Sequence, residues 1–147
     1  MSLKDRITQD IKDAMRARDK SRLSALRLVT AAIKQREVDE RTELDDTQIT
    51  VVLDKMVKQR RESIAQFEKA GRDDLIAVET LELDIITSYL PEQLGEEEIN
   101  ALIDAALEET GATSVKDMGQ VMGLLKPKLQ GRADMGAVSA LVRAKLG

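Results

Sequence analysis

Tyr89-Leu90-Pro91-Glu92-Gln93-Leu94 is the stretch that decides how this 147-residue chain is organised. Proline lacks a backbone N–H and disfavours helical geometry in the residue before it, so a helix arriving at Pro91 has to end at Leu90. Beyond the proline, Leu94 and Ile99 have the spacing of a hydrophobic staple at the start of a new helix. We therefore predict two helical parts, residues 1–90 and 91–147.

Four helices are predicted upstream of this junction, because apolar residues recur there at helical spacing. The first runs from residue 3 to a break at 18–20, and the second continues to about residue 39. The third starts at a capping box of Asp45 and Gln48 and stops before Gly71. The fourth begins at Asp73 and continues to the junction. Its apolar stripe, expected to be buried, is Leu75, Val78, Leu81, Ile85 and Tyr89.

Three shorter helices are predicted downstream. The fifth ends at Gly111, the sixth begins near Thr113-Ser114 and ends before Pro127, and the seventh follows a turn at 131–134. No segment alternates with the period of two that a half-buried strand requires. The fold class is therefore all-α: an N-terminal bundle of about four helices followed by a small three-helix C-terminal module.

Several classes of chemistry are disfavoured by composition. The chain has no cysteine and no histidine, which excludes thiolate nucleophiles and zinc–thiolate sites and removes the commonest general base. No Gly-rich nucleotide-binding loop is visible. The acidic runs 96–98 and 108–109 are explained by solvated helix faces, and the helix dipole additionally favours the three acids of 96–98 in a first turn. We predict no catalytic residue, no metal site and no cofactor.

Localisation is predicted from hydropathy and from the N-terminus. No apolar run approaches the ~20 residues needed to cross a bilayer. The first fifteen residues, MSLKDRITQDIKDAM, alternate charges with single apolar residues, unlike a signal peptide. We expect a cytoplasmic protein that does not enter a membrane.

Charge is distributed unevenly along the chain. The formal net charge of −4 is the balance of +6 over residues 1–36, −2 over 37–72, −12 over 73–109 and +4 over 110–147. Two basic ends thus flank an acidic middle, a pattern that favours a polyanionic partner.

Two groups of residues are candidates for phosphate binding. The N-terminal group is Lys12, Arg16, Lys20 and Arg22, for which an ordinary solvated surface is an equally good interpretation. The C-terminal group is Gly119, Gly123, Lys126, Lys128 and Arg132. The two glycines lie one helical turn apart and indicate the close approach of another backbone, which could belong to a neighbouring helix or to RNA.

Aromatic content helps to choose the kind of nucleic acid. Proteins that bind single strands stack bases on aromatic side chains, and this chain has only Phe67 and Tyr89, both on stripes expected in the core. Structured RNA recognised through shape and phosphates fits better.

The sequence resembles the YqeY-like (GatB/YqeY domain) family in stretches that run in order along nearly the whole chain. These stretches are 26–27, 31–34, 58–64, 67–75, 89–94, 119–122 and 131–134. The resemblance implies an N-terminal bundle and a C-terminal three-helix tail with a boundary near Pro91. The same module is similar to the C-terminal part of the B subunit of the glutamine-dependent tRNA amidotransferase, where it contacts the body of the tRNA and performs no chemistry. A related module is appended to a glutaminyl-tRNA synthetase.

By resemblance, carbon–nitrogen ligase activity with glutamine as amido donor enters consideration. The residues argue against it in this chain alone, which lacks a cysteine for a thiol glutaminase and a visible Ser/Lys amidase segment. Our leading hypothesis is a stand-alone accessory RNA-binding protein with tRNA as its expected ligand. The alternative is an adaptor that docks on a tRNA synthetase or an amidotransferase through its acidic fourth and fifth helices, and a catalytic role in amide transfer ranks third.

Overall fold

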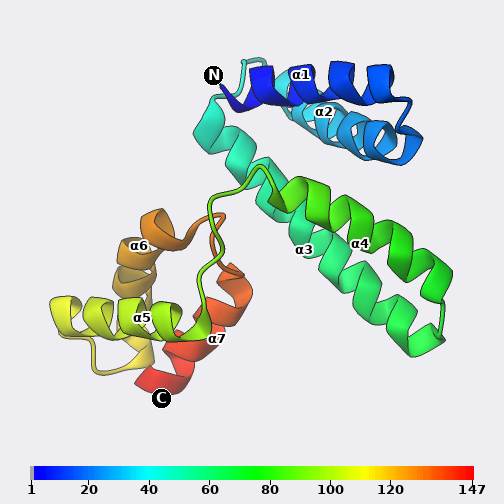
Figure 1. Cartoon of the computed structure of the whole chain (residues 1–147). Helices are drawn as coiled ribbons and strands as arrows, with labels where there is room; N and C mark the ends of the chain where they lie inside the picture. Colours follow the sequence, from blue (N-terminus) through cyan, green and yellow to red (C-terminus); the bar gives the residue numbers. More distant parts are fainter. Residues whose placement is uncertain (1) are drawn as a thin grey trace. The chain divides into compact units, whose positions relative to one another are not determined.

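The computed structural model describes residues 2–147 and contains seven α-helices and one short 3-10 helix within that range (Figure 1). The elements are α1 (Leu3–Ala17), α2 (Lys20–Glu40), α3 (Asp46–Ala70), α4 (Asp73–Thr87), α5 (Glu96–Thr110), η1 (Val115–Asp117), α6 (Met118–Leu129) and α7 (Met135–Leu146). No strand occurs between residues 2 and 147, so the all-α prediction is confirmed. The chain divides into two compact units, an N-terminal unit ending at Leu90 and a C-terminal unit, Pro91–Gly147.

Helix ends in the N-terminal unit are fixed by local capping. The Ser2 hydroxyl accepts the Asp5 N–H, and Asp45 and Gln48 form the complete capping box that opens α3, with bonds of 2.9 and 3.0 Å. Gly71 ends α3 at φ +67°, in the left-handed region where a residue without Cβ is favoured. Each of these ends is therefore determined by a few neighbouring residues.

The N-terminal unit is built from two helical hairpins, α1–α2 and α3–α4, drawn in blue and green in Figure 1. Its aliphatic core draws on all four helices. The fully buried side chains include Ile7, Leu26, Ile49, Leu53 and Ile86. Burial of such side chains, at roughly 25 cal/mol per Å² of apolar surface, is the main driving force for this packing.

The prediction that α4 buries its whole apolar stripe is wrong at two positions. Ile85 and Tyr89 are buried, but Val78 and Leu81 are 54% and 42% exposed. α4 packs mainly on α3 and less closely on α2, so its apolar stripe continues to Val78 and Leu81 without a partner that covers them fully. Within the hairpin, Arg60 of α3 donates from Nε to the Glu82 carboxylate at 3.2 Å.

Tyr89 anchors the end of the N-terminal unit to α1. Its hydroxyl donates to Asp10 at 2.5 Å, and the Arg6 guanidinium lies 4.9 Å from the ring centroid while donating to the Ser88 carbonyl. Burial, and then the hydrogen bond to Asp10, raise the pKa of Tyr89 above its usual value. The residue just before the junction is thereby held by contacts to a helix 79 positions earlier.

The C-terminal unit has its own core, separate from that of the N-terminal unit. Its most deeply buried side chains are Ile103, Val121, Leu125, Leu129, Val138 and Val142. The sixth helix differs from the prediction, because α6 continues through Pro127 to Leu129. Pro127 lies in the last turn, where its missing N–H removes a single bond to the carbonyl of Gly123, an exposed residue.

The start of the C-terminal unit is tied to the turn that precedes α7. The Gln93 side-chain amide donates to the Gly131 carbonyl at 2.7 Å, and the Leu94 N–H donates to the Arg132 carbonyl at 2.9 Å. The Arg132 side chain adds a third hydrogen bond between the same two segments, because its Nε donates to the Glu92 carbonyl at 3.4 Å. Residues 92–94 therefore belong firmly to this unit.

Candidate functional site

One exposed face of α6 carries two glycines and a lysine. Gly119, Gly123 and Lys126 follow one another at intervals of four and three residues, which places them on one side of the helix, and all three are exposed. A Cβ added at either glycine would meet no other heavy atom within 4 Å among the described residues. Close packing against another helix of the C-terminal unit therefore does not explain the two glycines. The face is open to a partner's backbone.

The other two C-terminal candidates do not join this face. Lys128 is exposed, but it lies two residues beyond Lys126, a rotation of about 200° around the helix. Arg132 is half-buried, and its guanidinium is engaged with the Glu92 carbonyl. The structure thus brings together Gly119, Gly123 and Lys126 and separates them from the remaining pair.

An internal repeat extends the candidate site to α7. Residues 117–129, DMGQVMGLLKPKL, and 134–146, DMGAVSALVRAKL, are identical at seven of thirteen positions, with an offset of 17. The repeat equates Gly119 with Gly136, Gly123 with Ala140 and Lys126 with Arg143. Both copies begin a helix just after an aspartate and bury equivalent valines, Val121 and Val138.

The exposed residues of the second copy were missed by the sequence analysis, although the repeat itself was a usable signal. Ala140 and Arg143 are exposed, so α7 also presents small side chains followed by a cation one turn later. The repeat also equates Lys128 with Lys145, but their contacts differ. Lys145 donates to Asp104 on α5 at 2.6 Å, whereas Lys128 is exposed. The comparable cations of the two copies are therefore Lys126 and Arg143.

The N-terminal candidates are also separated by the structure. Arg22 is half-buried and lies 3.9 Å from Asp10, the carboxylate that accepts the Tyr89 hydroxyl. Arg16 is 3.8 Å from Asp13 in an exposed pair, while Lys12 on α1 and Lys20 at the start of α2 are exposed. The group thus includes one half-buried cation and three exposed ones, of which Arg16 is paired with a carboxylate.

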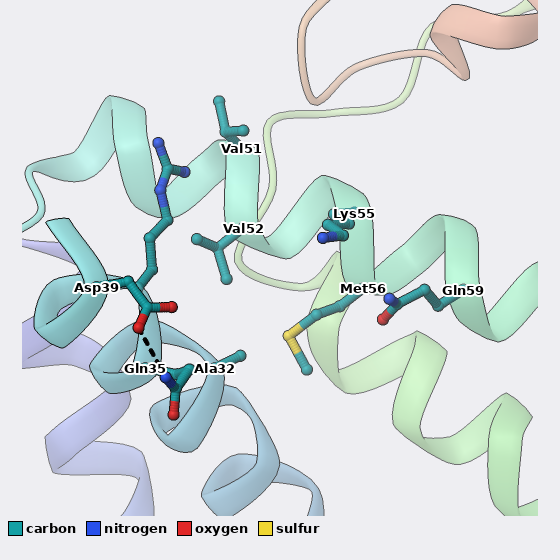
Figure 2. A pocket seen from close by; sticks show the side chains of 9 residues that line it. Ala32, Gln35, Asp39, Val51, Val52, Lys55, Met56 and Gln59 are labelled. Atoms are coloured by element: carbon teal, nitrogen blue, oxygen red, sulfur yellow. Dashed lines mark hydrogen bonds between the residues drawn. The ribbon is translucent and has the colours of Figure 1, made fainter.

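A groove of about 470 Å³ lies between α2 and α3 (Figure 2). Buried Val52 and Met56 contribute to its lining, and polar side chains of both helices surround them. In Figure 2, Asp39 accepts a hydrogen bond from the Gln35 amide, a contact of 3.0 Å. The residues that line it include no serine, threonine or tyrosine.

Several shifted pKa values belong to local structural contacts in the N-terminal unit. Lys4 Nζ donates to Glu37 at 2.5 Å, which lowers the pKa of Glu37 and raises that of Lys4; Glu37 also accepts the Leu44 N–H. The Arg72 guanidinium, which donates to Asp74, lowers the pKa of that carboxyl.

Among residues 2–147 no group of three or more carboxylates is arranged to hold a metal ion. None of the helices in that range is long and apolar enough to span a bilayer.

The family model for Yqey-like protein matches residues 4–146 of the chain. The chain belongs to the YqeY-like family. The match covers both units, so the family assignment made from the sequence is confirmed over nearly the whole chain.

Curated relatives of this YqeY-like protein include three fungal proteins, each named "Altered inheritance of mitochondria protein 41, mitochondrial". The protein of Eremothecium gossypii is 40% identical over 110 residues, which cover 73% of this chain and 60% of the relative. That of Pyrenophora tritici-repentis is 33% identical over 147 residues, 97% of this chain and 80% of the relative. That of Saccharomyces cerevisiae is 32% identical over 122 residues, 78% of this chain and 65% of the relative. In two of the three, the match therefore spans less than two thirds of the relative.

The prediction of a cytoplasmic protein is contradicted by these relatives, because their names place them in mitochondria. The sequence argument rested on the absence of a long apolar run and of a signal-peptide pattern in the first fifteen residues. A helical domain of this composition can fold in more than one compartment, so those features could not distinguish between them.

Proposed function

We propose that this YqeY-like protein is an accessory binder of structured RNA of the tRNA class and that its C-terminal unit makes the contact. The observation that carries the proposal is the repeat in α6 and α7. Each copy places small residues on an exposed face and a cation one turn later, Lys126 in α6 and Arg143 in α7. Phosphates are the groups that such cations select, and small residues let a sugar–phosphate backbone approach the helix.

Structured RNA is favoured over single strands. The C-terminal unit contains no aromatic residue, so it offers no ring on which an unpaired base could stack. A structured RNA can instead be bound through its phosphates and its shape. The resemblance to the tail of the tRNA amidotransferase B subunit supports tRNA as the class, and the proposal assigns no catalytic group to the chain.

The test is retention of a tRNA transcript by the full chain on filters from 50 to 200 mM salt, beside a single-stranded RNA of equal length. We expect tighter binding of tRNA, with a log–log salt slope of about −0.7 to −0.9 per phosphate contact. Lys126→Ala and Arg143→Ala should each weaken binding and reduce the slope by about one. Lys69→Ala, which removes an exposed cation from the end of α3, is the matched control.

The exposed face of α6 that carries Gly119 and Gly123 allows a second, independent test. Gly123→Ala has open space around the new Cβ and should stabilise α6 by about 0.5–1 kcal/mol, yet it should weaken tRNA binding if a backbone approaches there. Absence of tRNA retention at 50 mM salt would refute the proposal. Equal loss of binding in Lys69→Ala and Lys126→Ala would refute the assignment to the C-terminal unit.

A further inference from the structure

One side of α2 carries a row of cations. Lys20, Arg27 and Lys34 recur every seven residues and are all exposed. Seven residues advance an α-helix by about 10.5 Å and return nearly to the same side, so the row is about 21 Å long. Between Lys20 and Arg36, α2 has no acidic residue, and no carboxylate of its own interrupts the row.

Two shallow grooves lie beside the first half of this row. One, of about 340 Å³, is lined by Lys20, Leu23, Ser24, Arg27 and Leu28. The other, of about 280 Å³, is lined by Lys20, Ser21, Ser24, Val78, Leu81 and Glu82. Both include Lys20 and Ser24, so the two grooves adjoin along α2, and we call them together the α2–α4 groove.

The α2–α4 groove combines exposed aliphatic side chains with positive charge. Leu28, Val78 and Leu81 are 43%, 54% and 42% exposed, and two serines between them leave room for the side chains of a partner. Glu82 is the one acidic residue in the lining, and Arg60 Nε compensates its charge at 3.2 Å. The net character of the groove is therefore apolar along α4 and cationic along α2.

We propose that the α2–α4 groove binds an amphipathic helix of a protein partner. That helix carries aliphatic side chains along one stripe and acidic side chains at seven-residue intervals beside it. Its aliphatic stripe covers Leu28, Val78 and Leu81, while its carboxylates lie over the row from Lys20 to Lys34. Amphipathic helices that bind in an apolar groove contact it with side chains at intervals of three, four and seven residues.

Charge complementarity selects an acidic partner, and the aliphatic side chains select protein over RNA. Phosphates would match the cations but would leave Leu28, Val78 and Leu81 without apolar contacts, and the lining has no aromatic ring for a base. The α2–α3 groove of Figure 2 lacks this selectivity, because Arg36, Asp39 and Lys55 line it with charges of both signs. The proposal concerns the N-terminal unit and is independent of RNA binding by the C-terminal unit.

The probe is a fluorescein-labelled alanine-based peptide of roughly 18 residues, long enough to follow the row, with leucines at intervals of four and three and glutamates at intervals of seven. Fluorescence anisotropy with the full chain should show saturable binding. Binding should be at least about tenfold weaker for a scrambled peptide of the same composition and for a peptide with lysine in place of glutamate.

Substitutions of exposed residues test whether the peptide binds in the α2–α4 groove. Val78→Asp and Leu28→Asp should each weaken binding by about tenfold, because a carboxylate then replaces an apolar contact and repels the acidic peptide. Arg27→Glu should have a similar effect and is the second line of evidence if an aspartate variant fails to fold. The matched control is Val115→Asp, which alters an equally exposed aliphatic residue, 46% accessible, in the C-terminal unit.

Three results would overturn the proposal. The first is equal binding of the designed and scrambled peptides. The second is a loss of binding in Val115→Asp as large as in Val78→Asp. The third is evidence of another occupant: displacement of the peptide by a tRNA whose own binding falls in Leu28→Asp, or a dimer in sedimentation that Val78→Asp dissociates.

Discussion

Replacement of Tyr89 by phenylalanine tests how the end of the N-terminal unit is held. The change deletes the hydroxyl that donates to Asp10 at 2.5 Å and keeps the ring on which the Arg6 guanidinium rests. The cation–π contact and the buried ring volume are therefore preserved. The loss of stability then reports the hydrogen bond alone.

The expected magnitude follows from the surroundings of Asp10. A hydrogen bond to a charged group contributes about 1.5–3 kcal/mol. The Asp10 side chain is 26% exposed and keeps Arg22 at 3.9 Å, so water can replace part of the lost contact. We expect the free energy of unfolding of the N-terminal unit to fall by about 1.5 kcal/mol, at the lower end of that range. The corresponding decrease in Tm is roughly 6–12 °C for a unit of this size.

The same substitution removes an alkaline dependence of stability. The pKa of Tyr89 is raised in the folded state, chiefly by burial, so as pH rises the unfolded chain loses this proton first and unfolding is favoured. The contribution is complete below the unfolded pKa of about 10 and is lost as pH rises through the folded pKa. The stability difference between wild type and Tyr89→Phe should be constant from neutral pH to about pH 9 and should shrink above pH 10.

Hydrogen exchange followed by mass spectrometry in increasing urea at neutral pH measures the loss of stability, and the helices of the C-terminal unit serve as an internal reference. Urea midpoints recorded from neutral pH to above pH 10 measure the alkaline dependence. Protection should fall in α1 and α4 and stay unchanged in α5, α6 and α7. Equal stability of the two proteins at neutral pH, or a stability difference between them that does not shrink above pH 10, would refute this account of the anchor.

Three further substitutions have expected outcomes. Gly71→Ala forces a Cβ into a left-handed position at φ +67° and should cost about 1–2 kcal/mol in urea unfolding, whereas Gly119→Ala, with open space around it, should be stabilising. Glu82→Gln leaves Arg60, 14% exposed, with a neutral partner and should cost about 1–3 kcal/mol by thermal unfolding, less than the effect of breaking a fully buried pair. Glu37→Gln should reduce the loss of stability on acidification, because the lowered pKa of Glu37 contributes stability that is present above its unfolded pKa of about 4.3 and is lost as pH falls. A pH series of urea midpoints checks this last effect, and an unchanged acid limb would contradict it.

The fold could be predicted from the sequence where local signals set it. The capping box of Asp45 and Gln48 and the left-handed Gly71 depend on a few adjacent residues, and both are present in the structure. Val78 shows where this reasoning stops, because periodicity marks an apolar face and does not say whether another element covers it. Pro127 shows a second limit: a proline near a helix end removes one hydrogen bond, and that cost is small enough for the helix to continue past it.

The candidate site was predictable in composition and unpredictable in arrangement. Lys126 and Lys128 are neighbours in sequence, but helix geometry turns them to different sides. Arg132 donates to the Glu92 carbonyl, 40 residues earlier, and no local sequence pattern predicts this contact. By contrast, the role of Arg143 could have been inferred, because the repeat with an offset of 17 equates it with Lys126.

The placement of the two aromatic residues has a practical consequence. Phe67 and Tyr89 both belong to the N-terminal unit, and the chain has no tryptophan. Near-ultraviolet dichroism and tyrosine emission therefore follow the N-terminal unit alone, whereas far-ultraviolet dichroism follows the helices of both units. Unfolding curves recorded with the two signals on the intact protein should separate the stabilities of the units without cutting the chain, since the residues after Leu90 contribute no aromatic chromophore.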